Sequence, residues 1–482
     1  MRAVHMIRGK VPPALWLAPL GALWCASLLT DFQFAMWKPE TLGQLFNDML
    51  AHLLRLDPAI SPEAVGFESF TRDGRTYTYF GILPALLRLP AWLLGALDGV
   101  EYGRWSCTAA ILVMLTMLLR TLDVVEGQLP LAHRSVALQW IMRAAILLSG
   151  PQIYLLSTGS IYNEAVCWAS ALAAMFNLTA IQLIGTGARP SQGILIRMAV
   201  IAGLALHARA SIGVALCIGT GLICVREAIA ACYQEDWRAR LPRLMVPVTI
   251  LAGFGLVAAA INFARWGHPF LFADYTVYDI LSRRPGGLAI IQDYGEISMT
   301  RLWFGLLYYG TGVAYFLQTY GPFGDWLARH YLVIMTPPAP APLLIPLPLI
   351  LAAFGLWRLL RGMASEPVAR STAALLLTAE AFAGLIVLGY YAVALRYQAD
   401  FTPFVMLAAF LGLPVASAVV AELTVPVRHR WITAAFACML LGAAASHYTL
   451  VLNKVVDRGV DMSTRRAWAE WAPFAASALD RP

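Results

Sequence analysis

The chain has 482 residues, of which 59% are hydrophobic and only 13% are charged. A soluble globular protein needs about 25% charged residues to cover its surface, so this composition excludes that class and indicates a polytopic membrane protein. The net charge of +7 does not indicate nucleic-acid binding, because most of the arginines lie in short loops between apolar runs. The seven cysteines contain no CxxC pair, so we expect core residues rather than a metal site or disulfide framework.

Apolar runs of membrane-spanning length follow one another along most of the chain, since a spanning helix needs about 20 apolar residues. The candidate spans are residues 13–30, 81–97, 104–124, 137–156, 164–184, 195–208, 211–226, 244–264, 343–361, 370–392, 402–422 and 431–451. The run 81–97 contains Pro84, Arg88 and Pro90. If it were counted as a span, the segment 125–136 could not be cytoplasmic, which is where its His133 and Arg134 place it. We therefore expect 81–97 to lie along the interface, which leaves about eleven spans. The aromatic region 303–321 is expected to form an external or re-entrant helix.

The distribution of arginine and lysine predicts the orientation of these spans. Basic residues gather in the segments 226–243, 358–370 and 428–430 and before the first span, at Arg2, Arg8 and Lys10. These parts are therefore expected to be cytoplasmic. The first apolar run lacks a small-residue cleavage site, which favours a retained helix over a signal peptide. The segments left outside are the loops 31–80, 157–163, 265–342 and 393–400, and the short polar tail 452–482. We expect one integral membrane domain over residues 1–482, with 31–80 as its catalytic loop.

The first external loop opens with an amphipathic pattern over residues 41–56. Its apolar residues recur at helical spacing, at Leu42, Leu45, Phe46, Met49, Leu50, Leu53 and Leu54. Polar residues occupy the opposite side, which predicts a helix lying on the membrane surface. The alternative is a helix of a soluble-type domain.

The segment 67–80 predicts a β-hairpin, because Asp73-Gly74 separates two alternating runs rich in β-formers. A two-residue turn pairs Arg72 with Arg75, Phe70 with Tyr77, and Glu68 with Tyr79. One face then gathers a carboxylate, aromatic rings and guanidinium groups, a combination suited to sugars and phosphates. Glu68 could equally be a solvated edge charge.

Four passages carry a resemblance to a known family. They are Asp73 to Pro90, with DGRTYTYFG followed by PALLRLP; Ala208-Arg209-Ala210-Ser211; Asn262 to Phe270, NFARWGHPF; and Arg396 to Pro403, RYQADFTP. Their order and spacing resemble bacterial glycosyltransferases of the GT-C superfamily. These family 39-like enzymes are related in fold to protein O-mannosyltransferases and aminoarabinose transferases. The resemblance extends to about residue 420 and implies an all-α GT-C-like bundle in the bacterial inner membrane.

The same resemblance implies the transfer of a sugar from a polyprenyl-phosphate donor on the non-cytoplasmic side. The acceptor is then a glycan, a lipid or a protein, and a carboxylate of the first loop acts as base. Asp31, just after the first span, occupies the place of the acidic residue in such enzymes. The other candidate bases are Glu68, on the predicted hairpin, and Asp57, which precedes Pro58 and could simply stabilise a turn.

Sugar transfer from a lipid phosphate needs cations that hold the leaving phosphate, and arginine forks onto phosphate oxygens. Arg209, Arg265 and Arg396 all fall at external ends of spans, although each could instead anchor to lipid headgroups. The full set of predicted substrate-binding residues is Tyr77, Tyr79, Arg88, Glu164, Arg209, Arg265, His268, Arg396 and Tyr397. Glu164 could instead cap its helix. Glu380, inside an apolar run, suggests either a functional or a buried structural role.

No motif of metal-ligand spacing is present, so no metal or other cofactor is assigned beyond the lipid-linked donor itself, and metal dependence is left open. The competing function is a transporter or flippase of lipid-linked sugars. That class usually shows inverted repeats and several charged residues within spans, which this sequence lacks apart from Glu380. A non-catalytic scaffold would leave the arginines at the external ends unexplained.

Overall fold

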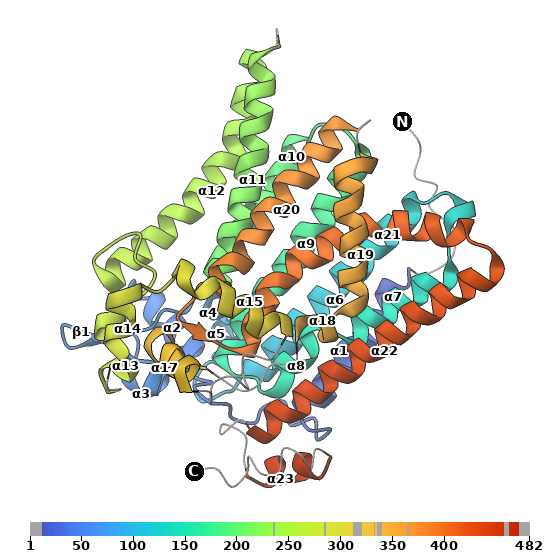
Figure 1. Cartoon of the computed structure of the whole chain (residues 1–482). Helices are drawn as coiled ribbons and strands as arrows, with labels where there is room; N and C mark the ends of the chain where they lie inside the picture. The colour runs from blue at the N-terminus through green and yellow to red at the C-terminus, as the bar shows by residue number, and fades with distance from the viewer. Residues whose placement is uncertain are drawn as a thin grey trace.

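The computed structural model describes residues 12–234, 237–283, 286–311, 321–331, 333–334, 340–363, 366–456 and 462–471. The basic residues Arg2, Arg8 and Lys10 lie outside this part, as do 312–320 of the predicted 303–321 helix and much of the tail 452–482. The described chain is a bundle of helices with very little sheet (Figure 1). The expected all-α polytopic architecture is therefore confirmed.

The longer helices form the body of the bundle. They are α1 (Ala14–Leu29), α6 (Gly103–Gln128), α7 (Val136–Leu148), α9 (Ile161–Thr186), α10 (Gln192–Ala208), α11 (Ala210–Cys232), α12 (Trp237–Trp266), α19 (Pro346–Trp357), α20 (Pro367–Leu388), α21 (Thr402–Glu422) and α22 (Val425–Val456). Within the described residues, seven helices are long and apolar enough to cross a membrane: those of α6, α9, α11, α12, α20, α21 and α22. These helices make the chain a membrane protein.

Shorter elements connect these helices or form the loops. The helices are α2 (Leu45–Leu53), α3 (Pro62–Val65), α4 (Leu83–Leu86), α5 (Leu89–Leu93), α8 (Pro151–Tyr154), α13 (Asp279–Arg283), α14 (Gly287–Tyr294), α15 (Leu302–Thr311), α17 (Gly321–His330), α18 (Ala341–Leu344) and α23 (Met462–Trp471). Single turns of 3₁₀ helix are η1 (Gly66–Glu68), η2 (Leu131–His133), η3 (Leu155–Ser157), η4 (Tyr275–Val277) and η5 (Met299–Arg301). A longer one is η8 (Leu395–Phe401), and Arg358–Gly362 is a π-helical turn.

Several predicted spans are interrupted, so the structure has fewer full-length helices than the eleven expected. The run 81–97 breaks into α4 and α5, each with a proline in its first turn, which agrees with its exclusion from the spans. The run 137–156 ends as a helix at Leu148, because Gly150 has a φ of 102° and Pro151 starts the next helix. The run 343–361 is likewise divided into α18 and α19 before Pro346. Apolar runs of sufficient length thus hide breaks set by proline and glycine.

Two small sheets lie in the loops. Strands β1 (Phe70–Arg72) and β2 (Arg75–Tyr77) are antiparallel, and β3 (Val333–Ile334) pairs in parallel with β4 (Ala392–Val393). In the first sheet Arg72 faces Arg75 and Phe70 faces Tyr77, which confirms the predicted hairpin register. The register stops there, because the preceding residues form η1 instead of extending β1. The predicted pairing of Glu68 with Tyr79 is therefore wrong.

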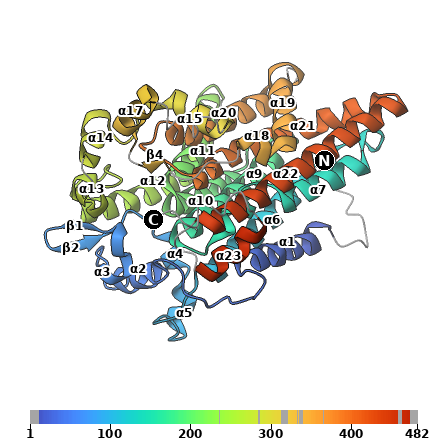
Figure 2. The same ribbon diagram turned by 60° about the horizontal axis from the view of Figure 1, so that its bottom comes forward.

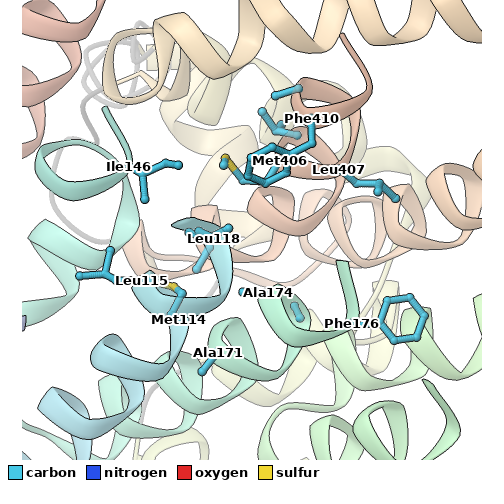
Figure 3. Packing of buried hydrophobic residues seen from close by; sticks show 14 of the residues in the cluster. Met114, Leu115, Leu118, Ile146, Ala171, Ala174, Phe176, Met406, Leu407 and Phe410 are labelled. Atoms are coloured by element: carbon cyan, nitrogen blue, oxygen red, sulfur yellow. The ribbon is translucent and has the colours of Figure 1, made fainter. Parts of the chain in front are cut away.

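The main hydrophobic core lies between α6, α9 and α21. Figure 3 shows Met114 and Leu118 of α6 beside Ala174 of α9 and Met406 and Phe410 of α21. Helices α19 and α21 approach so closely that a Cβ on Gly412 would lie 1.9 Å from a backbone oxygen of α19. This packed core fixes the helices whose ends carry the loops.

The segments that follow α1 and α12 meet at one end of the bundle. Figures 1 and 2 show β1, α2 and α3 beside α13 and α14, at the end opposite to the tip of the α11–α12 pair. The apolar side of α2 does not lie on a membrane surface as predicted. Leu45, Phe46 and Leu50 are fully buried against other loop residues and the start of α9, so the alternative of a helix packed within the protein is the correct one.

Candidate active site

A cavity of about 560 Å³ lies where the loops meet the ends of α10, α11, α12 and α20. Its charged residues are Arg209, Arg265, Arg396 and Glu296, with His207 beside them. Aromatic rings line it at Tyr79, Phe80, Tyr162, Tyr390 and Tyr397. Of the sequence-predicted residues, the structure thus brings together Tyr79, Arg209, Arg265, Arg396 and Tyr397. A volume of this size is typical of small-molecule sites.

Arg396 projects from η8 and is held by aromatic rings rather than by a carboxylate. Its guanidinium carbon lies 4.5 Å from the ring centroid of Tyr162 and 5.3 Å from that of Tyr397. It makes no hydrogen bond or ion pair to any residue that the structure describes. Cation–π contacts of this kind position a guanidinium while leaving its N–H donors free. Arg396 therefore presents unused donors to the cavity.

Arg265 closes the end of α12 and is only 4% exposed. Its Nη1 donates to the backbone oxygen of Phe80 at 3.0 Å, whereas its Nε is buried without a hydrogen-bond partner. A buried guanidinium with an unused donor is costly unless an anion completes it. Arg265 and Arg396 both line the cavity and give this part of it positive charge.

Arg209, between α10 and α11, has its charge neutralised within the protein. Its Nε lies 2.9 Å and its Nη2 2.7 Å from the two carboxylate oxygens of Asp400, and Ser211 donates to the same carboxylate. The fork geometry is the strong form of such a pair, and Asp400 is fully buried. This arrangement ties the α10–α11 junction to η8, which carries Arg396 and Tyr397.

Glu68 ends η1 just behind the cavity wall and is 7% exposed. Its carboxylate accepts hydrogen bonds from the hydroxyls of Tyr162 and Tyr278, the latter at 2.8 Å. Tyr162 itself lines the cavity, so Glu68 positions one of its aromatic walls. The neighbouring Tyr79 is partly buried, and desolvation together with the charge of Glu68 raises the pKa of its hydroxyl well above the usual value. That hydroxyl therefore keeps its proton at neutral pH and can donate a hydrogen bond.

The other two candidate bases do not line the cavity. Asp31, in a left-handed conformation with a φ of 55°, accepts from Lys454 and from the Trp468 indole at 2.9 Å, so it joins the end of α1 to α22 and α23. Asp57 accepts from the Ala59 amide and from Arg75. Burial pushes the pKa of Asp57 upward, but the Ala59 amide, His52 and Arg75 outweigh it and hold that pKa below the usual value. Both carboxylates are therefore held by partners within the protein, as expected for structural residues.

Arg88 and Glu164 form a buried ion pair, with 2.7 Å between nitrogen and oxygen and exposed fractions of 4% and 1%. The pair joins the segment between α4 and α5 to the start of α9, and neither residue lines the cavity. Tyr77 does not line the cavity either; it packs against Trp266 in a small hydrophobic cluster formed by the loops. His268 is exposed, and its Nδ1 accepts a hydrogen bond from the amide of Phe270.

We expect Arg88→Ala to lower the free energy of unfolding by about 3–5 kcal/mol, because it leaves the Glu164 carboxylate buried without a counter-charge. Thermal unfolding of the purified protein in detergent measures the loss. The matched control is the double variant Arg88→Met with Glu164→Leu, which removes both charges and should recover much of it. Equal stability of the parental protein and Arg88→Ala would contradict this structural role.

Sequence reasoning missed several lining residues, of which Glu296 is chemically the most informative. It lies between α14 and η5, and burial together with the nearby Asp274 raises its pKa to about 7. Tyr390 follows α20, and its ring closes the same side of the cavity. The sequence did show a carboxylate between Gly295 and Ile297, in a loop for which only the length and the position had been interpreted. Among the described residues, no group of three or more His, Cys, Asp and Glu side chains is arranged to hold a metal ion.

Comparisons with known proteins agree with this architecture. No protein-family model matches the sequence, and no curated protein matches it. Among solved structures, the apo form of the oligosaccharyltransferase of Archaeoglobus fulgidus is similar with a TM-score of 0.50 and 12% sequence identity, over 96% of this chain. The complex of the same protein with zinc and sulfate gives a TM-score of 0.47 and 13% identity, over 97% of this chain. The chain spans about 60% of the length of that oligosaccharyltransferase. The likeness shows that the chain has a fold like that of this oligosaccharyltransferase.

Proposed function

We propose that the protein is a membrane glycosyltransferase that transfers a sugar from a polyprenyl-phosphate donor to an acceptor on the non-cytoplasmic side. The observation that carries the proposal is the pair Arg265 and Arg396, two guanidinium groups without a carboxylate partner among the described residues, which line one cavity at the loop end of the bundle. The GT-C-type fold and the resemblance of the four sequence passages support the same class.

The arginines suit the leaving group of this reaction. When the bond between the sugar and the lipid phosphate breaks, negative charge grows on a phosphate oxygen. Guanidinium groups fixed beforehand stabilise that charge without reorganisation. The rings of Tyr79, Tyr162 and Tyr397 offer flat apolar faces, and the hydroxyls of Tyr79 and Tyr397 offer donors, for a sugar bound next to the phosphate.

The remaining wall of the cavity suits a lipid chain. It is formed by small and apolar residues of α11, α12 and α20, including Val214, Ala258, Ala259 and Val387. In the most apolar 18-residue stretch of α12, only 6% is buried within the protein. This helix therefore faces the surrounding lipid along most of its length. A polyprenyl chain can therefore lie along α12 while its phosphate reaches Arg265 at the helix end.

The second candidate is a transporter of lipid-linked sugars, and one observation favours it. Glu380 is buried midway along α20 at 1% exposure, and a carboxylate inside a span often marks a transport path. Glu380 does not line the cavity, and Asn177 of α9 is close to it. Both carboxylate oxygens of Glu380 are buried without a hydrogen-bond partner among the described residues, and no charged residue of the cavity is joined to it.

The test is incubation of the purified protein in lipid nanodiscs with a panel of radiolabelled polyprenyl-phosphate monosaccharides and membrane-derived acceptors. The proposal requires free polyprenyl phosphate and labelled acceptor to appear together. The same protein in sealed vesicles reports transport of labelled donor across the bilayer. Transport without cleavage of the donor would replace the enzyme by the transporter, and neither outcome with any donor would reject both.

The proposal also requires the cavity to open on the non-cytoplasmic side. We expect Asp73→Cys, at the exposed tip of the hairpin, to react with an impermeant maleimide in intact cells. Exposed Cys232, at the end of α11, should react only after permeabilisation, because it lies within the basic segment 226–243. The control is Cys232→Ser, which leaves the introduced cysteine as the exposed one, since the other six cysteines are buried or partly buried. Labelling of Cys232 but not of the hairpin cysteine in intact cells would reverse the orientation.

A further inference from the structure

We infer that Glu296 is the general base of the transfer reaction, accepting the proton of the acceptor hydroxyl. This inference rests on the proposed function, and it assigns the base to the second external loop rather than to the first. Glu296 is the carboxylate that lines the cavity among the described residues, where Arg265 and Arg396 are also found.

The carboxylate of Glu296 is available for this role. It makes no hydrogen bond and no ion pair with any residue of the described ranges. Two candidate bases of the first loop, by contrast, already have hydrogen-bond partners. Asp31 is held by Lys454 and Trp468, and Glu68 accepts from two tyrosine hydroxyls. A base must reach its proton within hydrogen-bond distance, which favours a carboxylate that faces the cavity and has no protein partner.

The backbone around Glu296 is fixed, although its side chain is free. The amide of Tyr391 donates to the carbonyl oxygen of Glu296 at 2.9 Å, and Arg301 donates to the same oxygen at 3.1 Å. The amide of Ser298 donates to the oxygen of Gly389 at 2.9 Å. These bonds clamp the segment to the residues that follow α20. Catalytic groups need such support, because a small displacement lowers the rate severely.

The proton balance of the step is simple. The acceptor oxygen forms a bond to the anomeric carbon of the sugar, and the bond from that carbon to the phosphate oxygen breaks. The bonding electrons leave with the phosphate, next to Arg265 and Arg396, and the hydroxyl proton passes to Glu296. The carboxylate then returns its proton to water. No further co-reactant is needed.

The local charges favour a base that works near neutral pH. Burial is the main cause of the raised pKa of Glu296, about 7, and Asp274 adds to it. Tyr275 and Tyr390 face the same group, and Arg301 contacts its backbone oxygen. Glu296 is protonated and inactive as a base below this pKa. We therefore expect the transfer rate to fall about tenfold for each pH unit below 7.

The experiment compares Glu296→Gln with the parental protein in the nanodisc assay between pH 5 and pH 9. We expect a loss of transfer of about 10²-fold or more, with donor binding unchanged and the rise in rate through pH 7 abolished. Asp293→Asn, at an exposed position of the same loop, is the matched control and should behave as the parental protein. Glu296→Asp should recover part of the rate and of the pH dependence.

Two outcomes separate this inference from the function on which it rests. If Glu296→Gln transfers sugar at the parental rate with the parental pH profile, Glu296 is not the base, while the glycosyltransferase assignment stands. If the parental protein cleaves no lipid-linked sugar, the proposed function itself fails. A lowered rate with an unchanged pH profile would mean that Glu296 only positions the acceptor, which also overturns the inference.

Discussion

Replacing Arg396 by alanine is expected to lower the rate of sugar transfer by about 10²-fold or more, while the protein stays folded. The guanidinium has no carboxylate partner among the described residues, so its removal leaves no unpaired buried charge behind. The lost interaction is the one with the phosphate oxygen that gains charge as the sugar leaves. Steady-state transfer with a polyprenyl-phosphate donor, beside a thermal unfolding curve, measures both quantities.

Two further variants make the result specific. Arg396→Lys keeps the charge but loses the fork geometry and much of the ring contact, so an intermediate rate is expected. Arg430→Ala, at an exposed position near the start of α22, is the control for a lost surface arginine and should not change the rate. Transfer by Arg396→Ala at the parental rate would leave this arginine as a contact to tyrosine rings only.

Replacing Asp400 by alanine is expected to cost about 3–5 kcal/mol of stability, as much as the loss of Arg88. Asp400 is fully buried and accepts from both Arg209 and Ser211, so its removal leaves the Arg209 charge without a partner. The pair joins the α10–α11 junction to η8. We therefore expect transfer to fall together with the unfolding temperature, because η8 carries Arg396.

The contribution of the Arg209–Asp400 pair is tested with a variant that lacks both charges. Arg209→Met with Asp400→Leu removes both charges and should be more stable than Asp400→Ala alone. Asp325→Ala, an exposed carboxylate on α17, is the control and should unfold as the parental protein does. If Asp400→Ala unfolds at the parental temperature, the pair does not hold the cavity wall.

The hairpin shows how far local rules reach. Asp73-Gly74 fixes a two-residue turn, so the register from Phe70 to Tyr77 was predictable from the sequence. The prediction failed for Glu68, because that residue follows Gly66, whose φ of 51° turns the chain into η1. Glu68 then reaches Tyr278, which lies 210 positions away in the chain. A contact of that kind depends on tertiary packing and leaves no local signal.

The membrane helices show a similar limit. Apolar length identified the helical regions, but the breaks at Gly150 and before Pro346 decided which of them are continuous. Helix α2 was read correctly as amphipathic, yet the pattern could not tell lipid from protein as its apolar partner. The structure shows that Phe46 and its neighbours pack against the loop core.

In the candidate site, too, some residues could be predicted from the sequence and others could not. Arginines at the ends of apolar runs were predictable, because charge is rare in this chain and its position relative to apolar runs is informative. Glu296 was not singled out, since loop 265–342 has no periodicity that marks one carboxylate among others. Its candidacy depends on the fold, which brings that loop against Gly389 and Tyr391 beyond α20.

The most direct measurement is a structure of the protein with a non-cleavable polyprenyl-phosphonate sugar bound in a lipid nanodisc. The account predicts the phosphonate between Arg265 and Arg396, the lipid chain along α12, and the sugar against the ring of Tyr162 with its anomeric carbon facing Glu296. A phosphonate bound elsewhere, with the cavity at Arg396 empty of ligand, would contradict the account.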